Sequence, residues 1–207
     1  MELHTDYRTG IPATVSPGTT ETVSPYSVEE LWRRKGVFWK QFDVADLLKL
    51  PIISARALVS GKPVIVDMVS GEGPLRLWSD SGMVMQIASN LLGNAARYTD
   101  RGRITLILGR QQDNLTIMVT DTGRGMSESD VKRVTSRMND RVARRTSGTP
   151  AFDTGLIRTG SLVELLGGNI SLASRRNEGT IVEVRLPLGP APAEQAPARE
   201  LTARSRV

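Results

Sequence analysis

Cysteine is absent from this 207-residue chain, and several other residue types are scarce. Without cysteine the chain forms no disulfide, carries no thiolate nucleophile and has no cysteine-based metal site. Histidine occurs once, and aromatic residues make up 4% of the chain. No apolar run approaches the roughly 18 residues of a membrane span, and the N-terminus lacks a basic-then-apolar signal pattern. These absences predict a soluble, cytoplasmic chain without a membrane segment.

The net charge and the apolar content further limit the partners and the number of domains that the chain can have. A net charge of +5 would suit nucleic acid or acidic lipid. The scarcity of aromatics and the lack of any known nucleic-acid-binding motif argue against a nucleic-acid partner. A hydrophobic content of 39% is enough for one α/β domain with a proper core. We therefore expect a single domain with tails.

Composition divides the chain into three parts. Residues 1–40 are predicted to hold an opening strand and an irregular insertion rich in Thr, Ser, Pro and Gly, with one short helix that Ser27 and Glu30 cap. Residues 41–188 carry the periodic apolar pattern of a folded domain. Residues 189–207, rich in Pro, Ala and Arg, are predicted to be a disordered tail.

Periodicity within residues 41–188 predicts three helices and about five strands. The predicted helices run from Asp43 to about Ser60, from Asp80 to Tyr98 and from Ser161 to Leu166, and the predicted strands cover residues 64–69, 104–108, 115–119, 170–172 and 180–186. Pro51 must kink the first helix or sit where the lost hydrogen bond is tolerated. The fold class is therefore α/β, a two-layer sandwich of a mostly antiparallel mixed sheet with three helices on one face.

Residues 127–153 interrupt this pattern. They are polar and basic, and they contain too few large apolar residues to belong to the core. We expect a mobile loop or a loosely packed helix. A solvated face is the ordinary explanation for such a run of basic residues, and phosphate binding is the alternative.

A polar stripe follows the second predicted helix. Asn90 and Asn94 are four residues apart and share one face, which Arg97 and Tyr98 continue by a turn. A neutral amide oxygen suits Mg²⁺, an arginine can neutralise phosphate, and a tyrosine ring can lie against a purine. The alternative for each residue alone is an ordinary solvent-facing position.

A carboxylate stands at the end of the strand 115–119. Asp121 is followed by Gly123 and Gly125, so the backbone turns tightly there. A carboxylate in this place can accept a hydrogen bond from an exocyclic amino group. Asp-x-Gly is also common in ordinary turns, so this motif is weak evidence by itself.

The order of these motifs, followed by a polar segment, the run Leu162 to Gly168 and a final hairpin from Ser174 to Leu188, resembles the ATP-binding domain of sensor histidine kinases. These domains belong to the GHKL superfamily, whose fold is the Bergerat α/β sandwich. The resemblance covers roughly residues 41–188. It implies that the chain binds ATP and Mg²⁺.

The resemblance also implies a role for each matching residue. Asn94, with Asn90 one turn before it, matches the Mg²⁺ site, and Arg97 matches the basic residue at the phosphates. Tyr98 matches the aromatic at the adenine, and Asp121 the carboxylate that reads the adenine amino group. Gly123 and Gly125 match the glycines of that box, Gly155 and Leu156 the end of a second glycine box, and Thr180 the threonine that supports Asp121.

Three positions set the expected chemistry apart from that of other members. The hydrolysing branches of the superfamily, such as gyrase, have a water-activating glutamate where this chain has Asn90, and an amide cannot act as a general base. Of the three glycines in the second box only Gly155 is present. His4, the single histidine, lacks the helical hairpin of a phosphoacceptor and is predicted to lie in the opening strand.

The first hypothesis is thus the Mg-ATP-binding catalytic domain of a two-component sensor histidine kinase. It would transfer the γ-phosphoryl group of ATP to a histidine on a separate dimerisation domain, with a response-regulator receiver downstream. The incomplete second glycine box motivates the alternative, a degenerate nucleotide-binding or protein-interaction module that regulates a partner. A water-activating ATPase is the third possibility, which Asn90 disfavours.

Overall fold

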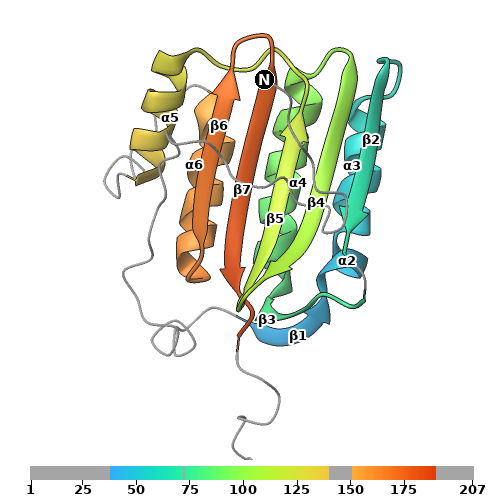
Figure 1. Ribbon diagram of the computed structural model, residues 1–207, viewed down its shortest axis with the longest axis vertical. Helices are drawn as coiled ribbons and strands as arrows, with labels where there is room; N and C mark the ends of the chain where they lie inside the picture. The colour runs from blue at the N-terminus through green and yellow to red at the C-terminus, as the bar shows by residue number, and fades with distance from the viewer. Residues whose placement is uncertain (1–37, 72, 140–150, 190–207) are drawn as a thin grey trace, which may run out of the picture.

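The chain folds into a sheet backed by helices, which a computed structural model describes over residues 38–71, 73–139 and 151–189 (Figure 1). In chain order the elements are β1 (Trp39–Asp43), α2 (Val44–Leu47), α3 (Lys49–Leu58), β2 (Val64–Ser70), β3 (Arg76–Asp80), α4 (Ser81–Tyr98), β4 (Gly102–Gln111), β5 (Asn114–Asp121), α5 (Glu128–Asn139), α6 (Ala151–Leu165), β6 (Asn169–Arg175) and β7 (Gly179–Pro187).

Five strands form the main sheet, in the order β2, β4, β5, β7, β6, and β1 pairs with β3 in a separate two-stranded sheet. β2 runs parallel to β4, since the chain between them returns through α4, and the other neighbours in the main sheet are antiparallel. The register of β5 against β7 places Asp121 opposite Thr180. The predicted mixed, mostly antiparallel sheet is confirmed.

Helices α3, α4 and α6 lie behind the main sheet in Figure 1, with α4 in contact with both of the others. The core fills the space between this helix layer and the sheet. Its fully buried side chains include Ile87, Leu92, Ile104, Leu106, Ile117, Val163 and Val184. Burial of each large aliphatic side chain contributes about 1.5–3 kcal/mol. The predicted two-layer sandwich with three main helices on one face is therefore confirmed.

The first predicted helix is divided in two. α2 ends at Leu47 and α3 begins at Lys49, with Leu48 between them buried in the core. Pro51 therefore lies in the first turn of α3, where the backbone N–H groups have no intrahelical acceptor. The division places the proline where its missing N–H removes no helix hydrogen bond. Both helices still pack on the same apolar surface.

Two segments are more ordered than their composition predicts. In α5, Val134 and Met138 are buried, so the expectation that this region stays out of the core is wrong. α6 begins at Ala151, ten residues before the predicted start at Ser161. Gly155 and Gly160 lower its helix propensity, and packing against α4 and α5 supplies the stability that propensity does not.

β3 is a strand that periodicity did not predict. It follows a turn with Gly73 and Pro74, and it pairs with β1 over five residues. Its last residue, Asp80, begins α4. The predicted opening strand with His4, the helix that Ser27 caps, and the tail from residue 190 onward lie outside the described residues.

Candidate nucleotide site

Helix α4 carries the polar stripe, and its start is fixed by a side-chain cap. Asp80 Oδ1 accepts hydrogen bonds from the backbone N–H groups of Gly82 at 2.9 Å and Met83 at 3.0 Å. Such a cap contributes about 1 kcal/mol. The opposite, apolar stripe of the helix is buried from Val84 to Ala96. Burial of this stripe fixes the rotation of α4, and that rotation decides where the asparagines, Arg97 and Tyr98 lie.

Asp121 ends β5 with a carboxylate that is largely removed from water. Its Oδ1 accepts a hydrogen bond from the Gly123 N–H at 2.9 Å. Burial raises the pKa of the Asp121 carboxyl above its ordinary value, and hydrogen bonds from the backbone amides of Gly123 and Thr180 partly oppose this rise. The carboxylate is thus held in one orientation by its own backbone and by the neighbouring strand.

The two glycines after Asp121 allow close approaches between backbone segments. A Cβ on Gly123 would overlap the carbonyl oxygen of Tyr98, at the end of α4. Gly125 has φ +58, and a Cβ there would overlap the carbonyl oxygen of Arg175. In this structure the glycines therefore join α4, β5 and the β6–β7 turn, which brings the three polar segments of the site together.

Thr180 faces the site from β7 and bonds to a serine that sequence reasoning missed. The two hydroxyl oxygens, Thr180 Oγ1 and Ser174 Oγ, are 3.0 Å apart. Ser174 Oγ also donates to the carbonyl of Gly179 and accepts from the N–H of Met126, both at 2.9 Å. Because the Ser174 proton is used on Gly179, Thr180 is the donor of the pair, and its own lone pairs remain directed toward a ligand. An alternating strand pattern gives no signal of this network.

These groups converge on one cavity between α4, α6 and the ends of β5 and β7. Its lining residues are Leu91, Asn94, Ala95, Tyr98, Val119, Asp121, Met126, Leu156, Thr180 and Val182. Apolar walls with a few convergent polar groups are typical of sites that hold a small organic ligand. The structure therefore brings together five of the predicted residues: Asn94, Tyr98, Asp121, Leu156 and Thr180.

Asn94 presents an amide group whose nitrogen is buried. Among the described residues, no group accepts a hydrogen bond from this Nδ2 atom. A buried unsatisfied amide costs about 1–3 kcal/mol, so this position suits a polar ligand. The oxygen of the same amide is a hard donor of the kind Mg²⁺ accepts, with nucleotide phosphates as the other ligands. The residues present therefore fit a magnesium nucleotide.

Asn90 and Gly155 lie at the margin of the cavity, where α6 packs on α4. Asn90 Nδ2 is 3.5 Å from the hydroxyl of Thr159, which in turn donates to the carbonyl of Gly155 at 2.9 Å. A Cβ on Gly155 would lie 3.2 Å from Asn94 Nδ2. The predicted second glycine box is thus the first part of a helix in this structure, and that helix covers the asparagine face of α4.

Among the described residues, two arginines lie over the ring of Tyr98. The guanidinium carbon of Arg97 lies 6.0 Å from the ring centroid, and that of Arg124 lies 4.5 Å from it. Both side chains are exposed. Arg97 therefore stands beside the cavity and does not line it, while Arg124 was not predicted as a site residue at all.

Two further features are absent from the described residues. No helix in the described ranges is both long and apolar enough to traverse a bilayer. Nor do three or more His, Cys, Asp or Glu side chains gather there in a group able to hold a metal ion.

Comparison with known proteins gives a family match over most of the site. The model of the histidine kinase-, DNA gyrase B- and HSP90-like ATPase family matches residues 79–190, more than half of the chain. The matched range runs from the start of α4 to the end of β7. It therefore contains every residue that lines the cavity.

Individual relatives are sensor histidine kinases. The chain is 30% identical over 174 residues to the sensor histidine kinase GacS of Pseudomonas protegens, covering 79% of this chain and 19% of GacS. It is 33% identical over 171 residues to the histidine protein kinase DivJ of Caulobacter vibrioides, covering 82% of this chain and 28% of DivJ. The chain thus spans less than a third of the length of these relatives.

Solved structures share the fold. The catalytic domain of histidine kinase ThkA superposes with a TM-score of 0.62 at 18% identity, covering 74% of this chain and 99% of that domain. Full-length ShkA in complex with AMPPNP superposes with a TM-score of 0.65 at 19% identity, covering 79% of this chain and 34% of ShkA. The chain therefore shares the overall fold of these domains.

Proposed function

Because this chain belongs to the histidine kinase-, DNA gyrase B- and HSP90-like ATPase family, we propose that it is the Mg-ATP-binding catalytic domain of a sensor histidine kinase. Its reaction would move the γ-phosphoryl group of ATP to a histidine on a separate dimerisation domain. The bond between the γ-phosphorus and its bridging oxygen breaks, its electron pair goes to ADP, and the new bond forms to an imidazole nitrogen.

One observation carries the proposal: a single cavity joins an amide, an aromatic ring and a buried carboxylate between apolar walls. A purine has two apolar faces and an exocyclic amino group, so it matches these walls and the Asp121 carboxylate. The Thr180 hydroxyl, whose proton is engaged by Ser174, can accept a second hydrogen bond from the ligand. The complex of the structural neighbour ShkA with AMPPNP supports a nucleotide in this fold.

The phosphate side is assigned to Asn94 and Arg97. Asn94 would hold Mg²⁺ through its amide oxygen, and the ion, when bound, would offset negative charge on the phosphates. Arg97 is exposed beside the cavity and has room to turn toward a triphosphate. Asn90 cannot remove a proton from water, which favours transfer to an acceptor histidine over hydrolysis. Positioning and charge neutralisation then supply most of the rate enhancement.

The partners follow from the same proposal. The matched region makes up only 19% of GacS and 28% of DivJ, so the acceptor histidine would lie elsewhere in the natural protein or on another chain. A response-regulator receiver would then take the phosphoryl group from that histidine. Both partners are inferred from the family and from the absence of a matching phosphoacceptor motif around His4.

Calorimetric titration with AMPPNP, with and without Mg²⁺, tests the binding site. Asp121→Asn should weaken binding roughly 10- to 100-fold, because a hydrogen bond to a charged acceptor contributes about 1.5–3 kcal/mol. Asn94→Ala should remove the Mg²⁺-dependent part of the affinity. Asp113→Asn is the matched control, since Asp113 is exposed in the turn at the other end of β5.

Undiminished binding in both site variants would contradict the assignment of the cavity. Phosphorylation of a supplied histidine-bearing dimerisation domain tests the reaction itself. Tight nucleotide binding without phosphotransfer would support the regulatory module instead, and steady ATP turnover by the isolated chain would support the hydrolase.

A further inference from the structure

Arg124 has a backbone that is fixed from two sides. Its N–H donates to the carbonyl of Tyr98 at 3.1 Å, and its own carbonyl accepts from the N–H of Asn177 at 2.8 Å. Gly123 and Gly125 flank it and permit these close approaches. The side chain of Arg124 therefore leaves the backbone from a rigid point directly beside the end of α4.

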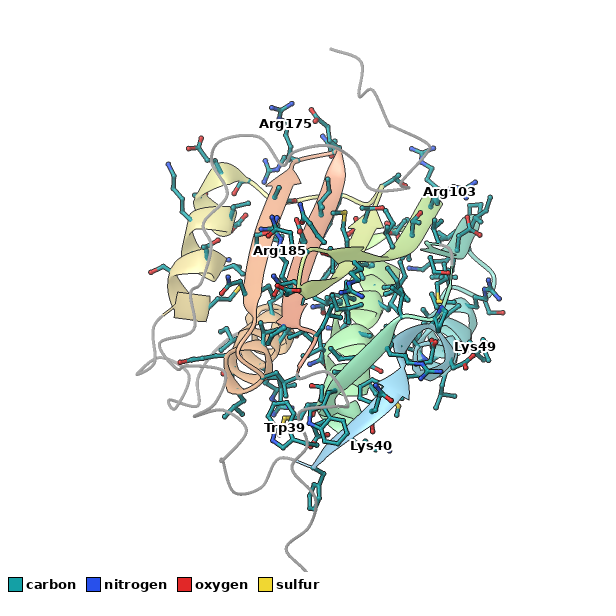
Figure 2. The ribbon with its side chains drawn as sticks, turned by 60° about the horizontal axis from the view of Figure 1, so that its bottom comes forward. Trp39, Lys40, Lys49, Arg103, Arg175 and Arg185 are labelled. Atoms are coloured by element: carbon teal, nitrogen blue, oxygen red, sulfur yellow. The ribbon has the colours of Figure 1, made fainter. Side chains whose placement is uncertain are left out.

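The guanidinium of Arg124 is placed on an aromatic ring. Its central carbon lies 4.5 Å from the centroid of the Tyr98 ring, well within the roughly 6 Å range of a cation–π contact. Among the described residues it forms no ion pair. By contrast, three other arginines of the sheet, labelled in Figure 2, pair with carboxylates: Arg103 with Asp67, Arg175 with Glu178 and Arg185 with Glu183.

Tyr98 is a wall of the cavity beside Asp121, whereas Arg124 does not line the cavity. The cation therefore acts on the ring and not on a ligand in the cavity. We infer that Arg124 is a positioning residue, which holds the Tyr98 ring in the orientation that a purine packs against. This inference rests on the proposed function, since it requires a nucleotide in the cavity.

The two arginines at Tyr98 then have separate tasks. Arg97, at 6.0 Å, is at the limit of cation–π range and can turn to phosphate with little loss. Arg124, at 4.5 Å and anchored by its backbone, stays on the ring. The effect of removing Arg124 is consequently independent of how many phosphates the ligand carries, while the effect of removing Arg97 grows with that number.

Titration of the full chain with ADP and with AMPPNP in Mg²⁺ tests this division. Arg124→Ala should weaken both ligands by the same factor, about two- to fivefold, the range of an exposed cation–π contact. Arg124→Lys, which keeps a cation, should recover at least half of the loss. The control is Arg110→Ala, which removes an equal charge at the opposite end of the β4–β5 hairpin and should change neither affinity.

A double-mutant cycle with Tyr98→Leu completes the test. Without the ring, Arg124→Ala should cause no further loss of affinity. A larger loss for AMPPNP than for ADP would overturn the inference and make Arg124 a phosphate contact. An equal loss in the Tyr98→Leu background would also overturn it, because Arg124 would then act without the ring. If Asp121→Asn weakens binding as expected while Arg124→Ala behaves as Arg110→Ala, the inference fails and the proposed function stands. Unchanged binding in Asp121→Asn would instead reject the site on which both depend.

Discussion

The two sides of the cavity are built differently. On the sheet side, Asp121 accepts from the Gly123 amide, and the Ser174 and Thr180 hydroxyls bond to each other and to backbone groups. On the helix side, α6 covers the asparagine face of α4, and the nitrogen of Asn94 has no partner within the described part of the chain. The polar groups on the sheet side therefore have hydrogen-bond partners in this structure, whereas the Asn94 amide nitrogen on the helix side has none among the described residues.

This difference indicates which side of the cavity suits the adenine and which side would have to adjust to the phosphates. Polar groups that are already bonded and oriented can read a base without rearrangement, so the sheet side suits the adenine. The unsatisfied amide and the single glycine of the second box lie where the triphosphate would be. On the proposed function, we therefore expect phosphate binding to shift or partly unwind α6 near Gly155, because that residue lies against Asn94.

Gly179→Ala should break the sheet side most severely. Gly179 has φ +102, and a Cβ there would overlap the carbonyl oxygen of Asp121. Backbone strain and overpacking should together lower the free energy of unfolding by about 3 kcal/mol or more, measured by urea denaturation. Gly61→Ala is the control, because Gly61 has φ +86 with open space around it, and it should cost about 1–2 kcal/mol. Equal losses would show that crowding at Asp121 is unimportant.

A pH series should sharpen the electrostatic character of the sheet side. Burial raises the pKa of Asp121, so its contribution to stability is present below the ordinary aspartate pKa and is lost as pH rises through the raised value. Asp121→Asn lacks this loss. As pH rises through the raised pKa, the free energy of unfolding of the wild type should therefore fall relative to that of Asp121→Asn.

Nucleotide affinity should change in the opposite direction over the same pH range. The ionised carboxylate is the better acceptor for an amino group, so AMPPNP should bind the wild type more tightly as pH rises through the raised pKa. Asp121→Asn should show no such rise. Parallel pH profiles for the two proteins would mean that another group titrates.

Gly155→Ala and Gly93→Ala form a pair that tests the helix side with the smallest expected effect. Alanine is favoured over glycine in a helix by about 1 kcal/mol. Around Gly93 a Cβ would meet nothing within 4 Å, so that variant should show the full gain in unfolding free energy and unchanged nucleotide affinity. At Gly155 the Cβ would lie 3.2 Å from Asn94 Nδ2. The gain there should be smaller and AMPPNP binding weaker; identical behaviour would separate α6 from the site.

The sequence was sufficient for elements whose signals are local. α4 was predicted from Asp80 to Tyr98 because a capping side chain and a 3.6-residue apolar stripe occur together. Periodicity also predicts strands over residues 104–108 and 115–119, and these lie within the adjacent strands β4 and β5. The grouping of Asn94, Tyr98, Asp121 and Thr180 came from the family resemblance, since nothing local connects residues so far apart in the chain.

The parts that were missed depend on tertiary contacts. α6 extends back to Ala151 through Gly155 and Gly160, whose low helix propensity is outweighed by packing on α4. The burial of Val134 and Met138 in α5 comes from α6 and β6, which a polar composition does not reveal. Ser174 and Arg124 act through neighbours on other elements, so an isolated strand or turn pattern contains no trace of them.

The direct pairing of Asp121 with Thr180 also constrains when the site can form. β5 and β7 are adjacent in the sheet, yet α5, α6 and β6 separate them along the chain. Closing so long a loop is entropically costly, and sheets that depend on such non-local pairs fold more slowly than structures built from local contacts. A chain truncated before β7 would contain both asparagines and the carboxylate without any pocket. Completion of the fold and acquisition of the nucleotide site are therefore the same event.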